Sequence, residues 1–485
     1  PPSYTSQSPP KINVGPSEEQ RYNKTPVFRD IWAAILFALV LASFVVFSVL
    51  AIQSLPAGTF SGAGAMGSST SFYSRPTFIC FALVAAAAFV LSLGYLGLMQ
   101  LCPRVMIIVS FWFSVAVGIG TAAYYFYRRL YWVAVLALIF AIVYALMWFY
   151  ARKRIPFATV MLTTVMDITR RFPATLGLGV GFLLLNLAFC LWWAVTLIST
   201  FSYMKKYESC SHYVNSAGRQ DVSCSNGPLI GVIVYLCFVW FWVTQVIYNV
   251  LHTTVAGVFA TFYFFEGSPM GYPTTTPTAS ALKRATTNSF GSVCFGSLLV
   301  AIFQTIRGIL QTLMNSNSDD AVGAFIACCI GCILAQIQAL LEFFNKYAYI
   351  QVAIYGKPFI PAAKDTWRLL TTRGIDLLIN DDLVGNVVAM GGILVGAVCA
   401  IIGYVFVSTV DPAYNATGTF TPIIILVSFF IGISLFFIPG QVIDSGNAAT
   451  FVCLAEDPAA LMRSKPMLFE QIRQSYPQVV DGLHV

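Results

Sequence analysis

The chain has 485 residues, of which 58% are hydrophobic and only 10% are charged. Soluble domains carry roughly 25% charged residues, so this composition excludes a disordered chain and argues against an ordinary soluble enzyme. In a membrane protein a net charge of +7 reports the orientation of the loops, and no nucleic-acid partner is expected. Apolar runs recur along most of the chain, which predicts an all-α polytopic membrane protein.

The first 29 residues lack the features of a membrane span. Residues 1–29 are rich in Pro, Ser and charge and contain no apolar core of a signal peptide, which predicts a disordered cytoplasmic tail. The sequence begins with Pro, so we expect the natural tail to be longer. The rest of the chain divides into a predicted transmembrane domain over 30–445 and a cytoplasmic C-terminal segment over 446–485.

Ten segments are long and apolar enough to span a bilayer, which takes about 20 predominantly apolar residues. Very short connections at 101–104 and 127–129 make the second, third and fourth spans antiparallel neighbours. The predicted spans cover residues 31–53, 77–100, 105–126, 130–150, 174–200, 229–256, 285–312, 321–345, 384–409 and 420–441.

The basic residues predict how these spans are oriented. With a cytoplasmic N-terminus, seven of the 27 Lys and Arg residues lie outside and the other 20 lie inside, a strong positive-inside bias. Both termini are then cytoplasmic. Cys210 and Cys224 fall in the predicted extracellular loop 201–228, where a disulfide can form. Asn415 begins an Asn-Ala-Thr glycosylation sequence in the 410–419 loop, also outside.

Two segments that mix basic and apolar residues, 152–173 and 357–383, are predicted to be amphipathic helices on the cytoplasmic face. Such helices either attach to anionic lipids or brace the spans that they connect, and the sequence leaves both interpretations open. The sixth span is unusually long, because the apolar run from Leu229 to Phe265 would extend about 55 Å as one helix. We expect an extended helix with a bend near Gly257.

The sequence carries no enzyme signature. It has no GxxxxGK[ST], HExxH or GxSxG motif, so we expect no catalytic activity, cofactor or metal. Cys328, Cys329 and Cys332 lie in an apolar segment, where small cysteines pack helices closely. The GxxxG spacings at 177–181 and 392–396 likewise predict contacts between helices.

Polar residues inside apolar spans usually face a cavity, because each costs free energy in lipid. In the sixth span Gln245, Asn249 and His252 follow i, i+4, i+7 spacing and share one helix face. Aromatic residues flank this face, and the seventh span begins with small polar residues, so we predict a pocket between spans five, six and seven. The candidate substrate-binding residues are Trp192, Trp193, Trp240, Trp242, Gln245, Tyr248, Asn249, His252, Asn288, Ser289 and Ser292.

An aromatic pocket suits a quaternary ammonium ligand, which donates no hydrogen bond from its charged group and is held by ring faces worth about 0.5–2 kcal/mol each. The alternative is that the aromatic residues contact lipid or neighbouring helices, because they make up 15% of the chain. Polar contacts between helices also stabilise bundles without any ligand, by about 0.6 kcal/mol each.

Two other charges lie inside predicted spans. Glu342 is expected to form a local ion pair beside Asn345 and Lys346, or else to belong to an inner gate. Arg307 is expected to extend outward toward the membrane surface.

The chain resembles the choline transporter-like family at three stretches that occur in order. These are LKRATTNSFGSVCFGSLLVAIFQTIR at 282–307, NKYAYIQVAIYGKPFIPAAKDTWRLL at 345–370 and ATFVCLAEDP at 449–458. The chain looks most like the fungal branch, the pH-nine-sensitive proteins, over essentially everything after the tail. The resemblance implies a ten-span transporter of the plasma membrane with cytoplasmic termini and, in animal relatives, choline or a related organic cation as substrate.

The sequence therefore predicts a plasma-membrane transporter that moves choline or a related small organic cation by alternating access without ATP. Two alternatives stay open: a transporter of another solute such as ethanolamine, and a non-transporting membrane scaffold or sensor in lipid homeostasis. The expected partners are the cation and membrane lipids, and the sequence does not determine the oligomeric state.

Overall fold

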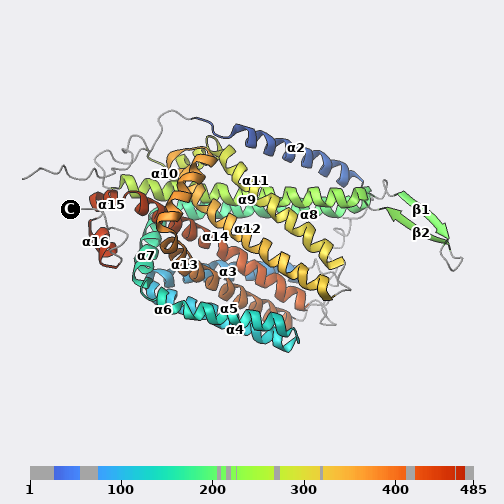
Figure 1. Cartoon of the computed structure of the whole chain (residues 1–485), viewed down its shortest axis with the longest axis horizontal. Coiled ribbons are helices and arrows are strands. Elements are labelled where there is room, and N and C mark those ends of the chain that lie inside the picture. The colour runs from blue at the N-terminus through green and yellow to red at the C-terminus, as the bar shows by residue number, and fades with distance from the viewer. Residues whose placement is uncertain are drawn as a thin grey trace, which may run out of the picture.

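Long helices run side by side along the molecule, and a small β-hairpin projects from one end (Figure 1). The structure is a computed structural model that describes residues 27–54, 75–204, 209–214, 220–225, 227–266, 274–316, 321–410, 421–464 and 466–475. The short helices α7, α10, α15 and α16 lie at the end opposite the hairpin (Figure 1). The molecule therefore has two distinct ends, as the predicted topology requires.

The elements occur in the following order: α2 (Ile31–Gln53), α3 (Arg75–Leu101), α4 (Pro103–Tyr127), α5 (Tyr131–Leu146), α6 (Trp148–Ala151), α7 (Ile155–Arg171), α8 (Ala174–Met204), β1 (Ser209–Val214), β2 (Gln220–Ser225), α9 (Gly227–Phe265), α10 (Pro277–Thr286), α11 (Phe290–Ser316), α12 (Ala321–Tyr355), α13 (Phe359–Val410), α14 (Thr421–Glu456), α15 (Pro458–Ser464) and α16 (Pro466–Ser475).

Within the part of the chain that the structure describes, nine helices are long and apolar enough to cross a membrane. Large apolar side chains such as Leu39, Val90 and Phe140 are exposed on their outer surfaces, as expected for helices that face lipid tails. The predicted all-α polytopic architecture is confirmed. The segment predicted as the eighth span lies in α12, a continuous 35-residue helix that is not one of these nine. The total of ten spans therefore stays a prediction.

The hairpin pairs β1 with β2 in antiparallel register and places Cys210 directly opposite Cys224. Direct pairing brings Cβ atoms to about 4.5–5.5 Å in a typical antiparallel ladder. Their side chains lie outside the described residues, so the disulfide stays a prediction. Asn415 also lies outside the described residues, and its glycosylation likewise stays a prediction.

The short connections do make α4 and α5 antiparallel neighbours, as predicted. The rings of Phe111 and Tyr144 stack with centroids 4.9 Å apart. A Cβ built on Gly118 would come within 3.2 Å of the Ala141 Cβ, so glycine lets the two helices approach closely. The GxxxG prediction is confirmed at 392–396, where both glycines contact α14, but it is wrong at 177–181, where neither glycine has a neighbour within 4 Å of a built Cβ.

The first predicted amphipathic helix exists as α7, and its apolar face is covered by protein. Phe157, Met161, Leu162 and Val165 are each at most 3% exposed and belong to a buried cluster with residues of α13 and α14. Of the two interpretations, the structure supports the one in which this helix braces the spans. At its C-terminal end Arg171 pairs with Glu266 at 2.6 Å, where a cation is favoured by the helix dipole.

The second predicted amphipathic helix is not a separate element. Helix α13 begins at Phe359 and continues without interruption to Val410, so segment 357–383 and the predicted span 384–409 share one helix of 52 residues. Nothing in the sequence between them breaks a helix, because no proline follows Pro361 before Val410. Helix α14 likewise passes through residue 445 to Glu456, and the domain boundary at 445 remains a prediction.

Helix α9 is the extended helix predicted from Leu229 to Phe265, with 39 residues in one element. Every residue from 249 to 265 is buried, whereas most residues from 227 to 248 are only partly buried. A Cβ on Gly257 would lie 3.3 Å from the Ala281 Cβ, which indicates that this glycine serves the close packing of α10. The predicted bend there stays a prediction.

Candidate functional site

The aromatic candidates of α8 and α9 pack against neighbouring helices through both their rings and their indole N–H groups. Trp242 is 1% exposed, and its Nε1 donates to the carbonyl oxygen of Cys294 on α11 at 3.1 Å. Its ring also contacts Phe37 of α2 with centroids 5.3 Å apart. These contacts hold α2, α9 and α11 together.

Helix α8 contributes two tryptophans in the same manner. Nε1 of Trp192 donates to Ser48 Oγ on α2 at 2.7 Å, and Nε1 of Trp193 donates to the Leu236 carbonyl oxygen on α9 at 2.8 Å. The rings of Trp193 and Trp240 lie 5.5 Å apart between centroids. We call Trp192, Trp193, Trp240 and Trp242 the aromatic wall. None of the four lines the two cavities described below.

The candidates at the start of the seventh span also lie away from these cavities. Ser292 Oγ donates to Asp30 Oδ2 at 2.6 Å, and the Asn288 carbonyl oxygen accepts from the Arg29 N–H at 2.9 Å. The same Asp30 oxygen accepts the first backbone N–H of α13 at 2.8 Å. Ser289 is buried beside them. These residues fasten the chain that enters α2 to the starts of α11 and α13.

The remaining four candidates line one cavity of about 550 Å³, which we call the charged chamber. It opens among α8, α9, α11, α12 and α13, and the predicted polar face of α9 forms one side of it. The lining residues are Asn186, Thr244, Gln245, Tyr248, Asn249, His252, Val300, Ala339, Glu342, Phe343, Asn345, Lys346 and Asp381.

Hydrogen bonds hold the α9 face in position. Asn249 Nδ2 donates to Ser297 Oγ on α11 at 3.0 Å. His252 Nε2 lies 2.9 Å from the Lys346 carbonyl oxygen and Nδ1 lies 2.7 Å from Ser445 Oγ. Since a carbonyl oxygen only accepts, Nε2 carries a proton. His252 therefore connects α9 to α12 and α14, and its ring is committed to structural contacts.

Lys346 binds two carboxylates at the edge of this chamber. Its Nζ lies 2.6 Å from Asp381 Oδ1 on α13 and 2.8 Å from Asp444 Oδ1 on α14. All three side chains are less than a quarter exposed, so their attraction is screened less than that of a surface pair. The cluster joins α12, α13 and α14.

The expected ion pair between Glu342 and Lys346 is wrong. Glu342 Oε1 instead accepts from Gln304 Nε2 at 3.2 Å and from Gln338 Nε2 at 2.8 Å. Lys346 points to α13 and α14 because two carboxylates there neutralise it better than one on its own helix. Arg307 Nη1 donates to Gln338 Oε1 on α12 at 3.0 Å, and its extension toward the membrane surface stays a prediction.

Two buried acceptor atoms in the charged chamber have no hydrogen-bond partner among the described residues. They are Asn186 Oδ1 and Asn345 Oδ1. Asn345 is 2% exposed and its Nδ2 donates to the Gly296 carbonyl oxygen at 3.1 Å. A buried acceptor without a partner costs about 1–3 kcal/mol, so a donor from a ligand or water that reached either oxygen would be favoured.

A second cavity of about 570 Å³, which we call the apolar chamber, adjoins the first. The two share Asn186, Thr244 and Tyr248. Asp444 lines the apolar chamber and Asp381 lines the charged one, so the Lys346 cluster lies at their junction.

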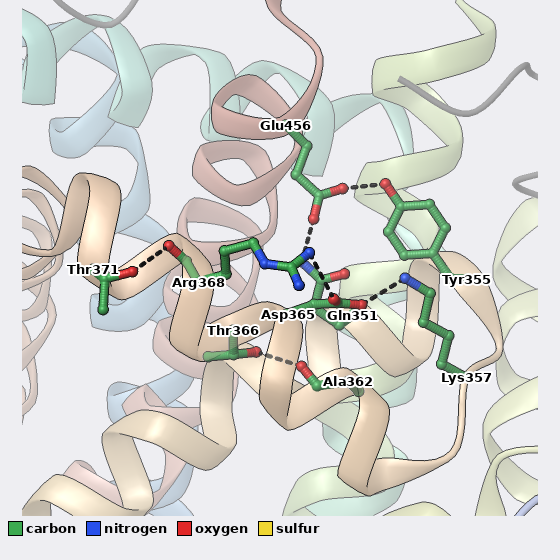
Figure 2. Close-up of polar contacts among 9 residues, drawn as sticks. All are labelled: Gln351, Tyr355, Lys357, Ala362, Asp365, Thr366, Arg368, Thr371 and Glu456. Carbon is green, nitrogen blue, oxygen red and sulfur yellow. Dashed lines mark hydrogen bonds and ion pairs between the residues drawn. The ribbon is translucent and has the colours of Figure 1, made fainter. Parts of the chain in front are cut away.

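A further polar cluster joins the end of α12 to the end of α14 (Figure 2). Glu456 accepts hydrogen bonds from Gln351 and Tyr355. Lys357 pairs with Asp365 at 2.7 Å and lies 4.3 Å from the centroid of the Tyr355 ring. These contacts tie α12, α13 and α14 together beyond the charged chamber.

Within the described residues, no group of three or more His, Cys, Asp or Glu side chains is arranged to hold a metal ion. The side chains of Cys328, Cys329 and Cys332 lie outside the described residues.

Comparison with known proteins identifies the family. The family model described as plasma-membrane choline transporter matches residues 135–459. The chain belongs to the choline transporter-like family. The match spans the helices that line both chambers, and it makes this chain an integral membrane protein of a transporter family.

Fungal relatives named Protein PNS1 match over nearly the whole chain. The one from Gibberella zeae is 36% identical over 469 residues, covering 96% of this chain and 85% of the relative. The one from Cryptococcus neoformans is 37% identical over 475 residues, with 96% and 85% covered. The one from Yarrowia lipolytica is 32% identical over 495 residues, with 100% and 86% covered. The predicted resemblance to the fungal branch of this family is confirmed.

Sequence reasoning missed Asp381 and Asp444 as members of the site. Both lie just beyond the predicted ends of spans, at 384 and 441, where charged residues are ordinary. The helices in fact continue past both residues. The sequence did contain a pattern that could have revealed Asp444. Most of the residues around it are apolar or small, and none of them breaks a helix, in the stretch QVIDSGNAATFVCLA.

Proposed function

We propose that this protein is a plasma-membrane transporter that moves choline or a related small organic cation by alternating access without ATP. The observation that carries the proposal is the charge of the cavity region. Asp381, Asp444 and Glu342 give three carboxylates against one ammonium, Lys346. At their formal charges the four sum to −2, so an added cation is electrostatically favoured there.

The shape and lining of the charged chamber suit such a ligand. Its volume of about 550 Å³ falls within the range of roughly 300–1,000 Å³ typical of small-molecule sites. Tyr248 and Phe343 contribute aromatic rings to the lining, and a ring face attracts an ammonium group by about 0.5–2 kcal/mol. The unpartnered Oδ1 atoms of Asn186 and Asn345 suit the hydroxyl of choline, which donates one hydrogen bond.

The contacts between α12, α13 and α14 are those that a transport cycle has to rearrange. The Lys346 cluster joins all three helices, and the Glu456 hydrogen bonds join α12 to α14 (Figure 2). Alternating access requires helices to separate on one side of a central site while they close on the other. We propose that the Glu456 cluster closes the cytoplasmic side, with both termini cytoplasmic and the hairpin outside, bridged between Cys210 and Cys224.

Ethanolamine is the second candidate substrate, and the same unpartnered acceptors favour it. Its primary ammonium donates hydrogen bonds, which a quaternary ammonium does not. Asn345 Oδ1 and Asn186 Oδ1 are available to accept them.

The test is uptake of labelled choline into liposomes that contain the purified protein, compared with protein-free liposomes, at two internal pH values. Saturable uptake is expected, and excess unlabelled ethanolamine measures the preference between the two cations. Uptake that follows the pH gradient indicates proton coupling, whereas uptake that ignores it indicates facilitated transport. Equal accumulation with and without protein would contradict the proposal.

A further inference from the structure

The two chambers differ sharply in chemistry although they share a wall. The charged chamber contains Glu342, Lys346 and Asp381. The apolar chamber lies between α8, α9, α13 and α14, and most of its lining is hydrocarbon. Its apolar side chains include Phe182, Leu183, Ile247, Val388, Phe437 and Ile438.

Most polar residues of the apolar chamber lie near the charged one, and Ser434 on α14 is a further polar residue of its lining. Asp444 faces both Lys346 and this chamber. Gln441 Nε2 donates to the Tyr248 carbonyl oxygen at 3.1 Å, and Tyr248 lines both chambers. A ligand that filled both would therefore have charge at one end and hydrocarbon at the other.

Helix α13 lines the apolar chamber with two small residues and with Val388. Gly385 and Ala389 are spaced i, i+4 and both line the chamber. A Cβ built on Gly385 meets no atom within 4 Å. The space beside it is therefore open, and a larger side chain at 385 would extend into it.

We propose that the two chambers form one binding site for an amphiphilic cation, with the ammonium group in the charged chamber and an apolar chain in the apolar chamber. This rests on the proposed cation site and extends it from small cations to those with an alkyl tail. A phospholipid phosphate is disfavoured as the occupant of the charged end, because carboxylates outnumber Lys346 there. Each methylene of the tail that is buried in the apolar chamber makes the binding free energy more favourable.

The experiment measures binding of n-alkyltrimethylammonium ions, from tetramethyl to octyl, to the purified protein in zwitterionic nanodiscs by the shift in unfolding temperature. Each cation is measured on its own, so the readout does not depend on choline. Affinity is expected to rise by up to about four-fold for each added methylene until the chamber is filled. Octyl sulfate, with the same chain and the opposite charge, is expected to give no shift.

Paired variants separate the chamber from the surrounding bilayer. Gly385→Leu places a side chain in the apolar chamber and is expected to flatten the dependence on chain length. Gly120→Leu is the matched control, since Gly120 is a helical glycine of α4 that also has open space around a built Cβ and does not line either chamber. It is expected to keep the wild-type dependence.

Three outcomes overturn the proposal. They are an affinity that does not change with chain length in the wild type, the same dependence on chain length in wild type and Gly385→Leu, and an unfolding-temperature shift with octyl sulfate equal to that with the octyl cation. A flat series in which tetramethylammonium and choline still bind would leave the proposed transport function standing. A rising series with no choline binding would instead contradict choline as substrate and support the two-chamber site.

Discussion

The aromatic wall and the charged chamber lie along the same two helices, α8 and α9, and use their polar atoms differently. In the aromatic wall, the indole N–H groups of Trp192, Trp193 and Trp242 are all donated to neighbouring helices. In the charged chamber, Asn186 Oδ1 and Asn345 Oδ1 are buried without partners. In the aromatic wall the hydrogen bonds serve helix packing, whereas the excess of carboxylates beside the charged chamber favours a bound cation.

The largest effect is expected for Asp381→Asn. It removes one of the two carboxylates that neutralise Lys346 and leaves Asp444 as the other. It also removes one negative charge from the chamber. Choline uptake into proteoliposomes is expected to fall by at least about 100-fold, because a unit charge about 4–5 Å from the cation contributes roughly 3–4 kcal/mol at an effective dielectric constant near 20.

The neighbouring residue offers a matched control. Asp382 is bonded to Tyr144 and Asn386 and does not contact Lys346. Asp382→Asn should retain most of the uptake, because an amide oxygen still accepts from both. Equal loss of choline uptake in Asp381→Asn and Asp382→Asn would mean that transport does not depend on the Lys346 cluster.

Removing both Lys346 and Asp381 should cost less stability than the sum of the two single losses. Asp381→Asn leaves Lys346 paired with Asp444 alone, whereas Lys346→Met leaves both carboxylates without their cation, and the double variant removes one of those two carboxylates. We expect the double variant to recover about 1–3 kcal/mol of unfolding free energy relative to additivity. Thermal unfolding of the four proteins in detergent measures this coupling, and strictly additive losses would refute it.

Tyr248→Leu tests the aromatic lining of the charged chamber. The substitution keeps an apolar side chain and removes a ring face worth about 0.5–2 kcal/mol to a bound ammonium. Choline affinity should fall by roughly 2- to 30-fold, with little change in unfolding temperature because Tyr248 is half exposed. Equilibrium dialysis with labelled choline gives the affinity. An unchanged dissociation constant would exclude Tyr248 from the site.

Trp242→Phe should show the opposite pattern. The variant loses the hydrogen bond to the Cys294 carbonyl oxygen and part of a fully buried ring, which costs about 1–3 kcal/mol of stability. Choline affinity should stay within two-fold of wild type. A lower affinity with unchanged stability would restore Trp242 to the pocket and contradict the comparison.

The smallest effect is expected for Ser292→Ala. The hydroxyl donates to Asp30 Oδ2, and a hydrogen bond to a charged group contributes about 1.5–3 kcal/mol. Asp30 keeps its hydrogen bond to the start of α13, so the loss of unfolding free energy should fall at or below the lower end of that range. Thermal unfolding should detect this loss of stability, and choline uptake should be retained. A large loss of uptake at unchanged stability would place Ser292 in the transport path.

Much of the fold could be predicted from the sequence, because apolar runs of the right length have few alternatives in a membrane. The polar face of α9 was also predictable, since Gln245, Asn249 and His252 follow helical spacing and line one chamber. The hydrogen-bond partners of Asn249 and His252 come from α11, α12 and α14, farther along the chain. No local pattern reports such contacts.

Aromatic residues misled the sequence analysis for a physical reason. Trp and Tyr both pack helices and bind cations, so Trp242 and Tyr248, six residues apart, look equivalent in sequence. Only the packing shows that Trp242 is buried against α11 while Tyr248 lines both chambers. The Lys346 cluster was missed because helices α13 and α14 extend beyond their apolar segments.

The most direct test of this account is equilibrium binding of labelled choline to wild type, Asp381→Asn and Trp242→Phe, measured side by side in the same nanodiscs. Saturable binding is expected for wild type, with nearly the same dissociation constant for Trp242→Phe and loss of binding for folded Asp381→Asn. Retained binding in Asp381→Asn together with loss in Trp242→Phe would contradict it and place the cation at the aromatic wall.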